Sequence, residues 1–379
     1  MDIDITQDDL SALQGGARFV TFGEVMVRDT PADMERLERT RQVHLSLAGS
    51  EYTLAMGLGR LGVPSAFITR LPDNPYGWQV RDTAREQGLN IDHLVWAPKT
   101  EPIGRYLYEL GRTPRQSTGW YQRMYSAASR LGPGMVDWPA ALRDCRLLHS
   151  SGITFGLANH SGYERNHCLE ALYEALEARP DGCLVGMDYN YRSTLWSKEQ
   201  CAGALTPLLR DHVDILITTI EDMAALYGLG AGRYSPDEIV KGDLGPLSDQ
   251  DLQAFMAALH ERFRPQIVAV TIRYPDTFEE HRWESAAMDA AGNYFRSPAV
   301  RKIVLWDRLG GGDTWNAGFY YGLLSEKDPA RRLEKGVMVG DAATCLKQTL
   351  MFDLPIVTRQ EVQALLNAWA KGGGKRTAR

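Results

Sequence analysis

The chain has 379 residues, 44% of them hydrophobic and 24% charged, and a formal net charge of −6. These proportions exclude a disordered or collagen-like chain and leave room for a sizeable core. The acidic excess argues against nucleic acid as a main partner, because phosphate binding needs a basic surface. No apolar run is long enough to span a membrane, and residues 1–13 lack the apolar stretch of a signal peptide. We therefore expect a cytoplasmic protein with no membrane partner.

The cysteines and histidines predict neither a disulfide framework nor a metal site. No cysteine belongs to a C-x-x-C pair, and no histidine stands at ligand spacing from a cysteine or carboxylate. We expect the thiols to be buried and neutral. The cysteines are Cys145, Cys168, Cys183, Cys201 and Cys345.

Strand-like and helix-like segments alternate along most of the chain. This alternation is typical of βαβ units, so we expect an α/β fold with a doubly wound, mostly parallel sheet and flanking helices. The segment 228–245, rich in Gly, Pro and charge, predicts a surface excursion. The expected strands are 19–27, 65–71, 147–150, 183–188, 215–218 and 267–272, and the expected helices are 51–61, 76–87, 163–178, 198–210, 252–263 and 314–323.

Two segments, about 28–47 and 103–125, contain strand-like stretches with no helix between them. In the second, two aromatic arms flank a turn region rich in Gly, Pro and Ser, which predicts a β-hairpin. A small β element of this kind would form a lid over a cleft. We expect residues 17–370 to form a single domain that carries this lid, and residues 371–379 to form a disordered tail.

The sharpest local signal is LGGGDTWNAGF at 309–319, where Gly310, Gly311 and Gly312 precede Asp313 and a predicted helix. Glycines let backbone N–H groups approach a ligand closely, and a helix N-terminus favours an anion. A carboxylate at that point can accept the proton of a hydroxyl group that attacks a phosphoryl group held over the glycines. The alternative is a glycine-rich turn in which Asp313 is only an N-cap.

A second glycine pattern, G-x-G-x-x-G at 57–62, does not favour a dinucleotide site. Its glycines lie late in a predicted helix and before a strand, whereas that fingerprint follows a strand and opens a helix. The chain also has no G-x-x-x-x-G-K-[ST] phosphate loop.

Several polar residues stand where a sugar could be held. Gly49 and Ser50 begin a predicted helix and offer a backbone and a hydroxyl donor, although Ser50 could be only an N-cap. Arg192 follows a predicted parallel strand, at the end where open α/β sheets bind ligands, and could clamp a carboxylate or phosphate or form a surface salt bridge. Arg123 lies among tyrosines on the proposed lid, which suits an acidic sugar or serves packing and solubility.

From about residue 19 to 366, the chain resembles the PfkB (ribokinase-like) carbohydrate kinases, most closely the 2-keto-3-deoxygluconate kinases. The strongest match is the segment 307–319, DRLGGGDTWNAGF, followed by the segments at 346–349 and 357–362. The resemblance implies a ribokinase-like fold and phosphorylation of a sugar or sugar-acid hydroxyl with ATP and Mg²⁺. It implies that Asp313 is the catalytic base and that Gly310, Gly311 and Gly312 form the anion hole.

The resemblance also implies substrate and nucleotide residues. The implied substrate set is Gly49, Ser50, Thr53, Tyr106, Tyr121, Arg123 and Arg192, and the implied nucleotide set is Thr219, Asp222, Thr271 and Arg273. No protein ligand to a metal is implied, and the lid suggests a homodimer.

The chain departs from the family pattern at three positions. Thr53 and Thr219 stand where the family usually has asparagine, and no glycine turn follows Thr271. The first departure leaves open a kinase of a neutral sugar or nucleoside. The last leaves open a degenerate module that binds a sugar acid without turnover.

Overall fold

The computed structural model describes residues 3–8, 10–13, 16 and 18–372. Most of the expected tail, residues 373–379, lies outside the described residues. Among the residues described, no helix combines the length and the apolar character needed to cross a membrane.

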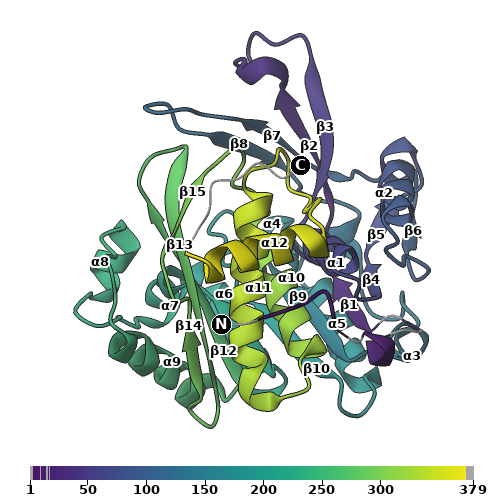
Figure 1. The fold of residues 1–379 in the computed structure, drawn as a ribbon. Helices are drawn as coiled ribbons and strands as arrows, with labels where there is room; N and C mark the ends of the chain where they lie inside the picture. The colour runs from purple at the N-terminus through teal and green to yellow at the C-terminus, as the bar shows by residue number, and fades with distance from the viewer. Residues whose placement is uncertain (1–2, 9, 14–15, 17, 373–379) are drawn as a thin grey trace.

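A nine-stranded sheet runs through the centre of the molecule, in the order β14-β13-β12-β11-β10-β9-β1-β4, with β15 also paired to β13 (Figure 1). The strands from β12 to β4 pair in parallel, whereas β13, β14 and β15 form an antiparallel edge. The expected α/β class with a mostly parallel sheet is confirmed. The strands are β1 (Phe19–Phe22), β4 (Ser65–Ile68), β9 (Leu147–Ser151), β10 (Leu184–Asp188), β11 (Ile215–Thr218), β12 (Ile267–Pro275), β13 (Glu280–Asp289), β14 (Tyr294–Arg296) and β15 (Arg301–Val304).

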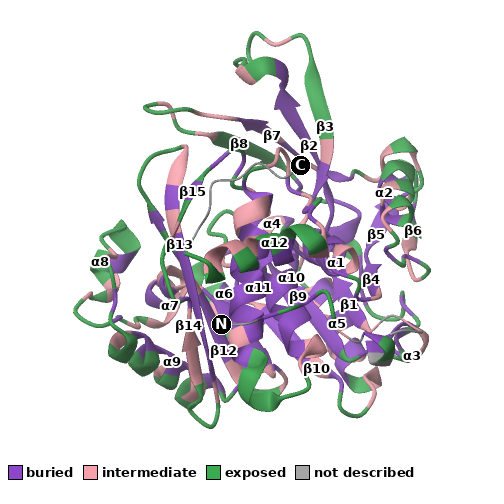
Figure 2. Cartoon of the chain, viewed as in Figure 1, coloured by how far each residue is buried: buried purple, intermediate pink, exposed green. Residues whose placement is uncertain are grey.

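Helices bury both faces of this sheet, so its strands alternate between two apolar cores. Leu147 belongs to one core and Leu148 to the other, and Ile215 and Leu216 divide in the same way. One core is packed by α1 (Ser50–Arg60), α10 (Gly311–Ser325), α11 (Arg332–Lys347) and α12 (Arg359–Ala370). The other is packed by α3 (Trp138–Ala141), α4 (Gly152–His160), α5 (His167–Ala178), α6 (Lys198–Asp211), α7 (Ile220–Tyr227) and α9 (Asp249–Phe263). Figure 2 shows the buried strands and helices at the centre of the molecule.

A second sheet, the lid sheet, projects from this body (Figure 1). Its order is β3-β2-β7-β8, with the two central strands parallel and each outer strand antiparallel to its neighbour. The strands are β2 (Met26–Pro31), β3 (Val43–Ala48), β7 (Gly104–Glu109) and β8 (Thr118–Gln122). The expected hairpin is therefore present as β7 and β8. β2 is buried throughout, whereas β8 is exposed throughout.

The expectation of one strand over 19–27 is wrong. β1 ends at Phe22, and β2 begins at Met26 in the lid sheet. A Cβ atom at Gly23 would lie 2.2 Å from the carboxyl group of Glu51, so the chain passes directly over that side chain as it leaves the main sheet. The apolar run is continuous because both strands are buried, each in a different sheet.

Two other boundaries are corrected. The strand expected over 65–71 divides into β4 and β5 (Arg70–Pro72), and β5 pairs with β6 (Val95–Ala97) instead of the main sheet. The helix expected over 163–178 begins only at residue 167, and α4 precedes it. The helix α2 (Pro75–Glu86) lies where one was expected, and the surface excursion after α7 contains the short α8 (Pro236–Lys241).

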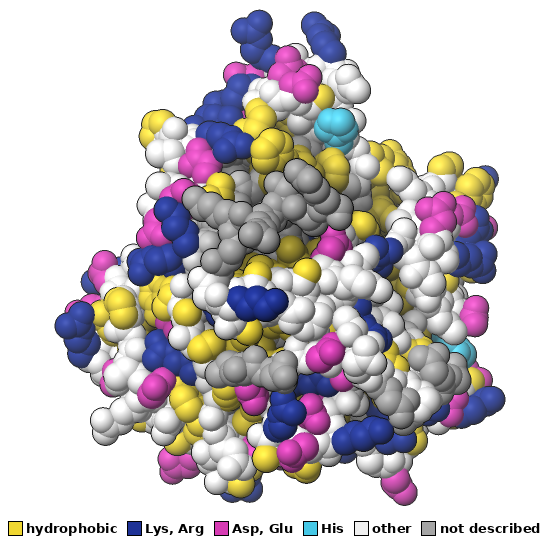
Figure 3. All heavy atoms as spheres, in the orientation of Figure 1, with side chains coloured by type: hydrophobic (Ala, Val, Ile, Leu, Met, Phe, Trp, Pro, Cys, Tyr) yellow, Lys and Arg dark blue, Asp and Glu magenta, His cyan; other side chains and the backbone are white. Residues whose placement is uncertain are grey.

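The surface carries charges of both signs. Figure 3 shows basic and acidic side chains intermixed over one face of the molecule, with Lys and Arg at the tip of the lid sheet. Such mixing agrees with the small net charge.

Candidate active site

A cavity of about 560 Å³ opens where the parallel strands β10, β11 and β12 end. Open α/β sheets bind ligands at the carboxyl ends of their strands. The loop before α10 closes one side of the cavity, and Tyr121 of the lid sheet lines it from another. The other lining side chains that bear on chemistry are Asp188, Asn190, Arg192, Thr219, Glu221, Asp222, Thr271, Arg273, Arg308, Asp313 and Asn316.

The glycine loop has the geometry of an anion cradle. Gly310 is the N-cap of α10 with φ 73°, and a Cβ atom there would lie 2.2 Å from the carbonyl oxygen of Asp353, so this position requires glycine. The hydroxyl of Thr314 donates to the Gly310 carbonyl over 2.6 Å, and that of Thr344 donates to the Gly311 carbonyl over 2.8 Å. The N–H of Gly311 donates to the carbonyl of Arg308 over 3.3 Å. The other N–H groups of the first helical turn lack partners within the helix, so they can turn toward a ligand.

The side chain of Asp313, next to this loop, contacts the first turn of α1. Its Oδ1 accepts a hydrogen bond of 2.5 Å from the hydroxyl of Ser50, the first residue of α1 after the N-cap Gly49. Asn190 donates to the same hydroxyl over 3.4 Å. Burial raises the pKa of Asp313 above its usual range, although the bond from Ser50 opposes this. A carboxylate with a raised pKa is a stronger proton acceptor, as a general base requires.

Besides Asp313, two carboxyl groups that line the same cavity have raised pKa values. Asp188 accepts a hydrogen bond of 2.9 Å from Asn316 of α10, and burial, with the nearby charges of Asp313 and Asp222, raises its pKa to about 7. Burial also raises the pKa of Asp222 to about 6, against the positive charge of Arg192. Asp188 and Asn316 are absent from the site residues expected from the sequence. The available signal was that Asp188 ends a predicted parallel strand.

Three arginines, Arg192, Arg273 and Arg308, bring positive charge to the cavity. All three are exposed, and in the part of the chain that the structure describes none of them forms an ion pair. Arg308 was not expected as a site residue, although it lies within the strongest family match. Guanidinium groups around a helix N-terminus that begins with glycines suit a ligand with phosphate or carboxylate groups.

The expected lid residues divide into two groups. Tyr121 lines the cavity and stacks on Tyr106, with ring centroids 5.2 Å apart. Tyr106 itself is buried and donates its hydroxyl to Asp353 over 2.9 Å. Arg123 is buried in an ion pair with Glu24, so its charge is already balanced within the protein. The buried Thr53 does not line the cavity.

A buried ion-pair cluster joins the lid sheet to the glycine loop. Arg28 of β2 contacts Asp307 over 2.6 Å and Asp353 over 2.7 Å, and its own side chain is fully buried. Asp307 stands three residues before Gly310. Sequence reasoning missed this cluster, for which the only signal was a charged residue within an apolar strand.

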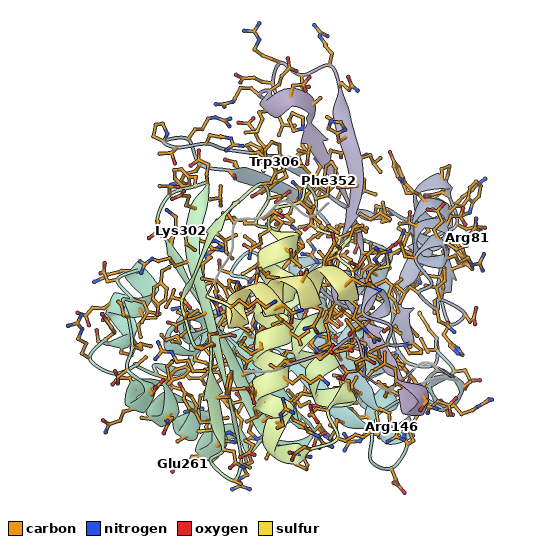
Figure 4. The ribbon with its side chains drawn as sticks, viewed as in Figure 1. Arg81, Arg146, Glu261, Lys302, Trp306 and Phe352 are labelled. Atoms are coloured by element: carbon orange, nitrogen blue, oxygen red, sulfur yellow. The ribbon has the colours of Figure 1, made fainter. Side chains whose placement is uncertain are left out.

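Three more residue pairs connect the lid sheet to the body. The backbone N–H and the hydroxyl of Thr113, in the β7–β8 turn, donate to the carboxylate of Glu279 over 2.7 and 2.5 Å. Figure 4 shows Trp306 and Phe352 beneath the lid sheet. The guanidinium of Arg28 lies 5.6 Å from the ring centroid of Phe352, and that of Arg112 lies 5.6 Å from that of Trp306.

The comparisons with known proteins agree on one group of enzymes. Residues 17–271 match the family described as pfkB family carbohydrate kinase. A 2-dehydro-3-deoxygalactonokinase of Haloferax volcanii is 29% identical over 358 residues, covering 94% of this chain and 98% of the relative. A 2-dehydro-3-deoxygluconokinase of Thermoproteus tenax is 25% identical, covering 84% and 85%. The crystal structure of a 2-dehydro-3-deoxygluconokinase from Thermotoga maritima has a TM-score of 0.80 and 27% identity, covering 93% of this chain and 99% of that one.

Proposed function

Because this chain belongs to the PfkB family of carbohydrate kinases, we propose that it phosphorylates a hydroxyl group of a keto-deoxy sugar acid such as 2-keto-3-deoxygluconate or 2-keto-3-deoxygalactonate. The observation that carries the proposal is that Asp313 lies beside the glycine loop in a cavity lined by three arginines, none of which has an ion-pair partner among the described residues. The names of the similar proteins support a sugar acid as the acceptor.

In this proposal Asp313 takes the proton of the attacking hydroxyl. Its Oδ1 is held by Ser50, which fixes the orientation of the carboxylate, and its raised pKa favours proton acceptance. The N–H groups of Gly310, Gly311 and Gly312 stabilise the charge that develops on the transferred phosphoryl oxygens. Tyr121 and the lid sheet cover the cavity and exclude water, which would otherwise compete with the sugar hydroxyl.

Kinases of this family use ATP together with Mg²⁺. The nucleotide would lie along Thr219, Thr271 and Arg273, which all line the cavity; Thr219 follows β11, and the other two belong to β12. Mg²⁺ neutralises phosphate charge when bound, and the carboxylates of Glu221 and Asp222 in the same cavity are the kind of oxygen ligand it takes. A cavity with a few carboxylates and several guanidinium groups fits a metal held largely by phosphate oxygens and water.

Recognition of the sugar carboxylate is assigned to Arg192. Its guanidinium is exposed to the cavity and donates within the protein to the carbonyl of Tyr191 over 2.8 Å. Arg123, the other candidate from the sequence, is committed to Glu24 and lies outside the cavity lining. Arg123 therefore shapes the lid sheet in this proposal, and Arg192 contacts the substrate.

An acceptor panel tests the function. The protein is incubated with Mg·ATP and 2-keto-3-deoxygluconate, 2-keto-3-deoxygalactonate, ribose, fructose or adenosine, and ADP release is followed. We expect kcat/KM to be highest for a keto-deoxy acid. A higher value for a neutral sugar or nucleoside would refute the sugar-acid assignment. If calorimetry detects no binding of Mg·ATP, the protein is a degenerate binding module.

A variant pair tests the carboxylate contact. Arg192→Met should lower kcat/KM for the keto-deoxy acid by at least about tenfold, because it removes a charged hydrogen bond that contributes about 1.5–3 kcal/mol. The same change should affect a neutral acceptor less. The matched control is Arg81→Met, because Arg81 is paired with Asp82 at the surface of α2. Equal losses for acidic and neutral acceptors would contradict the role of Arg192.

We also propose that two copies associate through their lid sheets. The exposed strands carry large apolar side chains at Val43, Leu45 and Trp120, which are 39–46% exposed. Apolar side chains gathered on an exposed sheet are a common feature of interfaces. Light scattering should give twice the chain mass, and Trp120→Glu should shift it toward the monomer. A wild-type monomer would exclude this association.

A further inference from the structure

The end of α11 brings a buried ammonium group against the glycine loop. Lys347 is 0% exposed, and its Nζ donates to the carbonyl oxygen of Asp307 over 3.1 Å. The same Nζ donates to the carbonyl oxygen of Leu309. These two carbonyls lie on either side of Arg308, immediately before Gly310.

Carbonyl groups are unusual sole partners for a buried lysine, because a buried charge is normally paired. Lys335, on the same helix, follows the rule: it is 5% exposed and contacts Asp8 over 2.7 Å. Among the described residues Lys347 has no ion pair within 4 Å, and the carboxylate of Asp307 is engaged by Arg28. Burial lowers the pKa of Lys347, and the more distant charges of Asp307 and Asp353 oppose that effect.

The contact with Leu309 bears on the direction of a catalytic N–H group. In a planar trans peptide the C=O and the following N–H point in opposite directions. An ammonium that holds the Leu309 carbonyl therefore fixes the N–H of Gly310 on the opposite side of that peptide. The ammonium also places positive charge next to a loop proposed to receive a phosphoryl group.

We propose that Lys347 is a positioning residue whose ammonium acts as a built-in monovalent cation: it holds the carbonyls of Asp307 and Leu309, orients the glycine loop toward anions, and removes any need for an added monovalent cation. This inference rests on the proposed role of Gly310, Gly311 and Gly312 as the phosphoryl cradle.

The test replaces the ammonium and then returns a cation from solution. Lys347→Ala leaves two carbonyl oxygens facing an empty space, and carbonyl oxygens replace the hydration shell of monovalent cations. The matched control is Lys335→Ala, which removes a buried lysine of the same helix that pairs with a carboxylate. Binding of inorganic phosphate is measured by calorimetry, and kcat by ADP release, in tetramethylammonium chloride and in ammonium or potassium chloride at equal ionic strength.

We expect Lys347→Ala to bind phosphate at least about tenfold more weakly and to lose about a hundredfold in kcat, the effect of misplacing one oxyanion donor. Ammonium or potassium should restore most of both losses. The Lys335→Ala variant should respond equally to all three salts. A folded Lys347→Ala variant with unchanged phosphate affinity, or with losses that no monovalent cation repairs, would overturn the proposal.

A second measurement uses the unaltered protein and does not depend on the variant folding. Its kcat and phosphate affinity should be the same in tetramethylammonium and in potassium chloride, and activation by potassium of more than about threefold would overturn the proposal. Failure of the proposed function looks different, because the unaltered protein would then phosphorylate no acceptor while its phosphate affinity could still be compared with that of the variants.

Discussion

The buried cluster of Arg28, Asp307 and Asp353 makes a quantitative prediction about stability. Arg28→Met removes the cation and leaves two carboxylates without their partner. The side chains of Arg28 and Asp307 are 0% exposed and that of Asp353 is 11% exposed, so water cannot replace the lost contacts. Removing one partner of a buried pair costs about 3–5 kcal/mol.

The expected shift in melting temperature follows from the size of the chain. An unfolding entropy of about 2.1 cal/mol/K per residue, applied to 379 residues, gives about 0.8 kcal/mol/K. A loss of about 3–5 kcal/mol therefore lowers Tm by about 4–6 °C. The surface control Arg81→Met, whose guanidinium pairs with Asp82 in solvent, should change Tm by less than about 1 °C.

Differential scanning fluorimetry of three variants tests this reasoning. The third variant combines Arg28→Met with Asp307→Asn and Asp353→Asn, which keeps the shapes and removes the orphaned charges. It should recover at least half of the lost Tm, because the cost arises from unpaired carboxylates. If Arg28→Met has the same Tm as the unaltered protein, or if the Tm of the triple variant is no higher than that of Arg28→Met, the assigned cost is wrong.

Three other predictions concern the cavity. Asp313→Asn should lower kcat by at least about a hundredfold without lowering Tm, and near-normal turnover would refute the role of Asp313 as the base. In the unaltered protein, kcat/KM should fall on acidification at a higher pH than an ordinary aspartate would give, because burial raises the pKa of Asp313. Asp188 has a pKa of about 7 in the folded protein against 3.8 for an ordinary aspartate, so its contribution to stability is complete below pH 3.8 and is lost as the pH rises through 7. Between pH 6 and pH 8, the Tm of the unaltered protein should therefore drop relative to that of Asp188→Asn. Parallel Tm profiles of the two proteins would contradict this. Gly310→Ala should lower the free energy of unfolding in urea by about 1–3 kcal/mol, because φ is 73° and the new Cβ would lie 2.2 Å from the Asp353 carbonyl oxygen. Gly312→Ala should lower it less, because a Cβ there meets no described heavy atom within 4 Å. Equal losses in the two variants would refute the strain at Gly310.

The parts of the fold that the sequence predicts are those with a local signal. β11 is a short, fully buried run between helices, and α9 begins after the capping residue Ser248 and repeats buried apolar residues at helical spacing, so both can be located from the local sequence. The helix α4 was missed because most of its residues are buried, and an apolar segment with glycines shows no polar face of period 3.6. The division between β1 and β2 depends on which sheet each strand joins, which is a tertiary property.

The same distinction holds for the site. The segment from Gly310 to Asp313 is contiguous, so its chemistry can be inferred from the sequence. Other contacts join residues that are far apart in the chain: Arg123 pairs with Glu24, and Lys347 donates to two carbonyls. Only the packing of the folded chain determines which charged side chain is paired within the protein and which faces the cavity.

The hydrogen bonds between Thr113 and Glu279 have a thermodynamic consequence. Thr113 belongs to the lid sheet's hairpin, and Glu279 directly precedes β13, which is paired along its length with β12, a wall of the cavity. In the proposed function, a sugar that binds beneath the hairpin would therefore also restrict the wall of the cavity assigned to the nucleotide. Linkage is reciprocal, so each substrate should lower the dissociation constant of the other by the same factor.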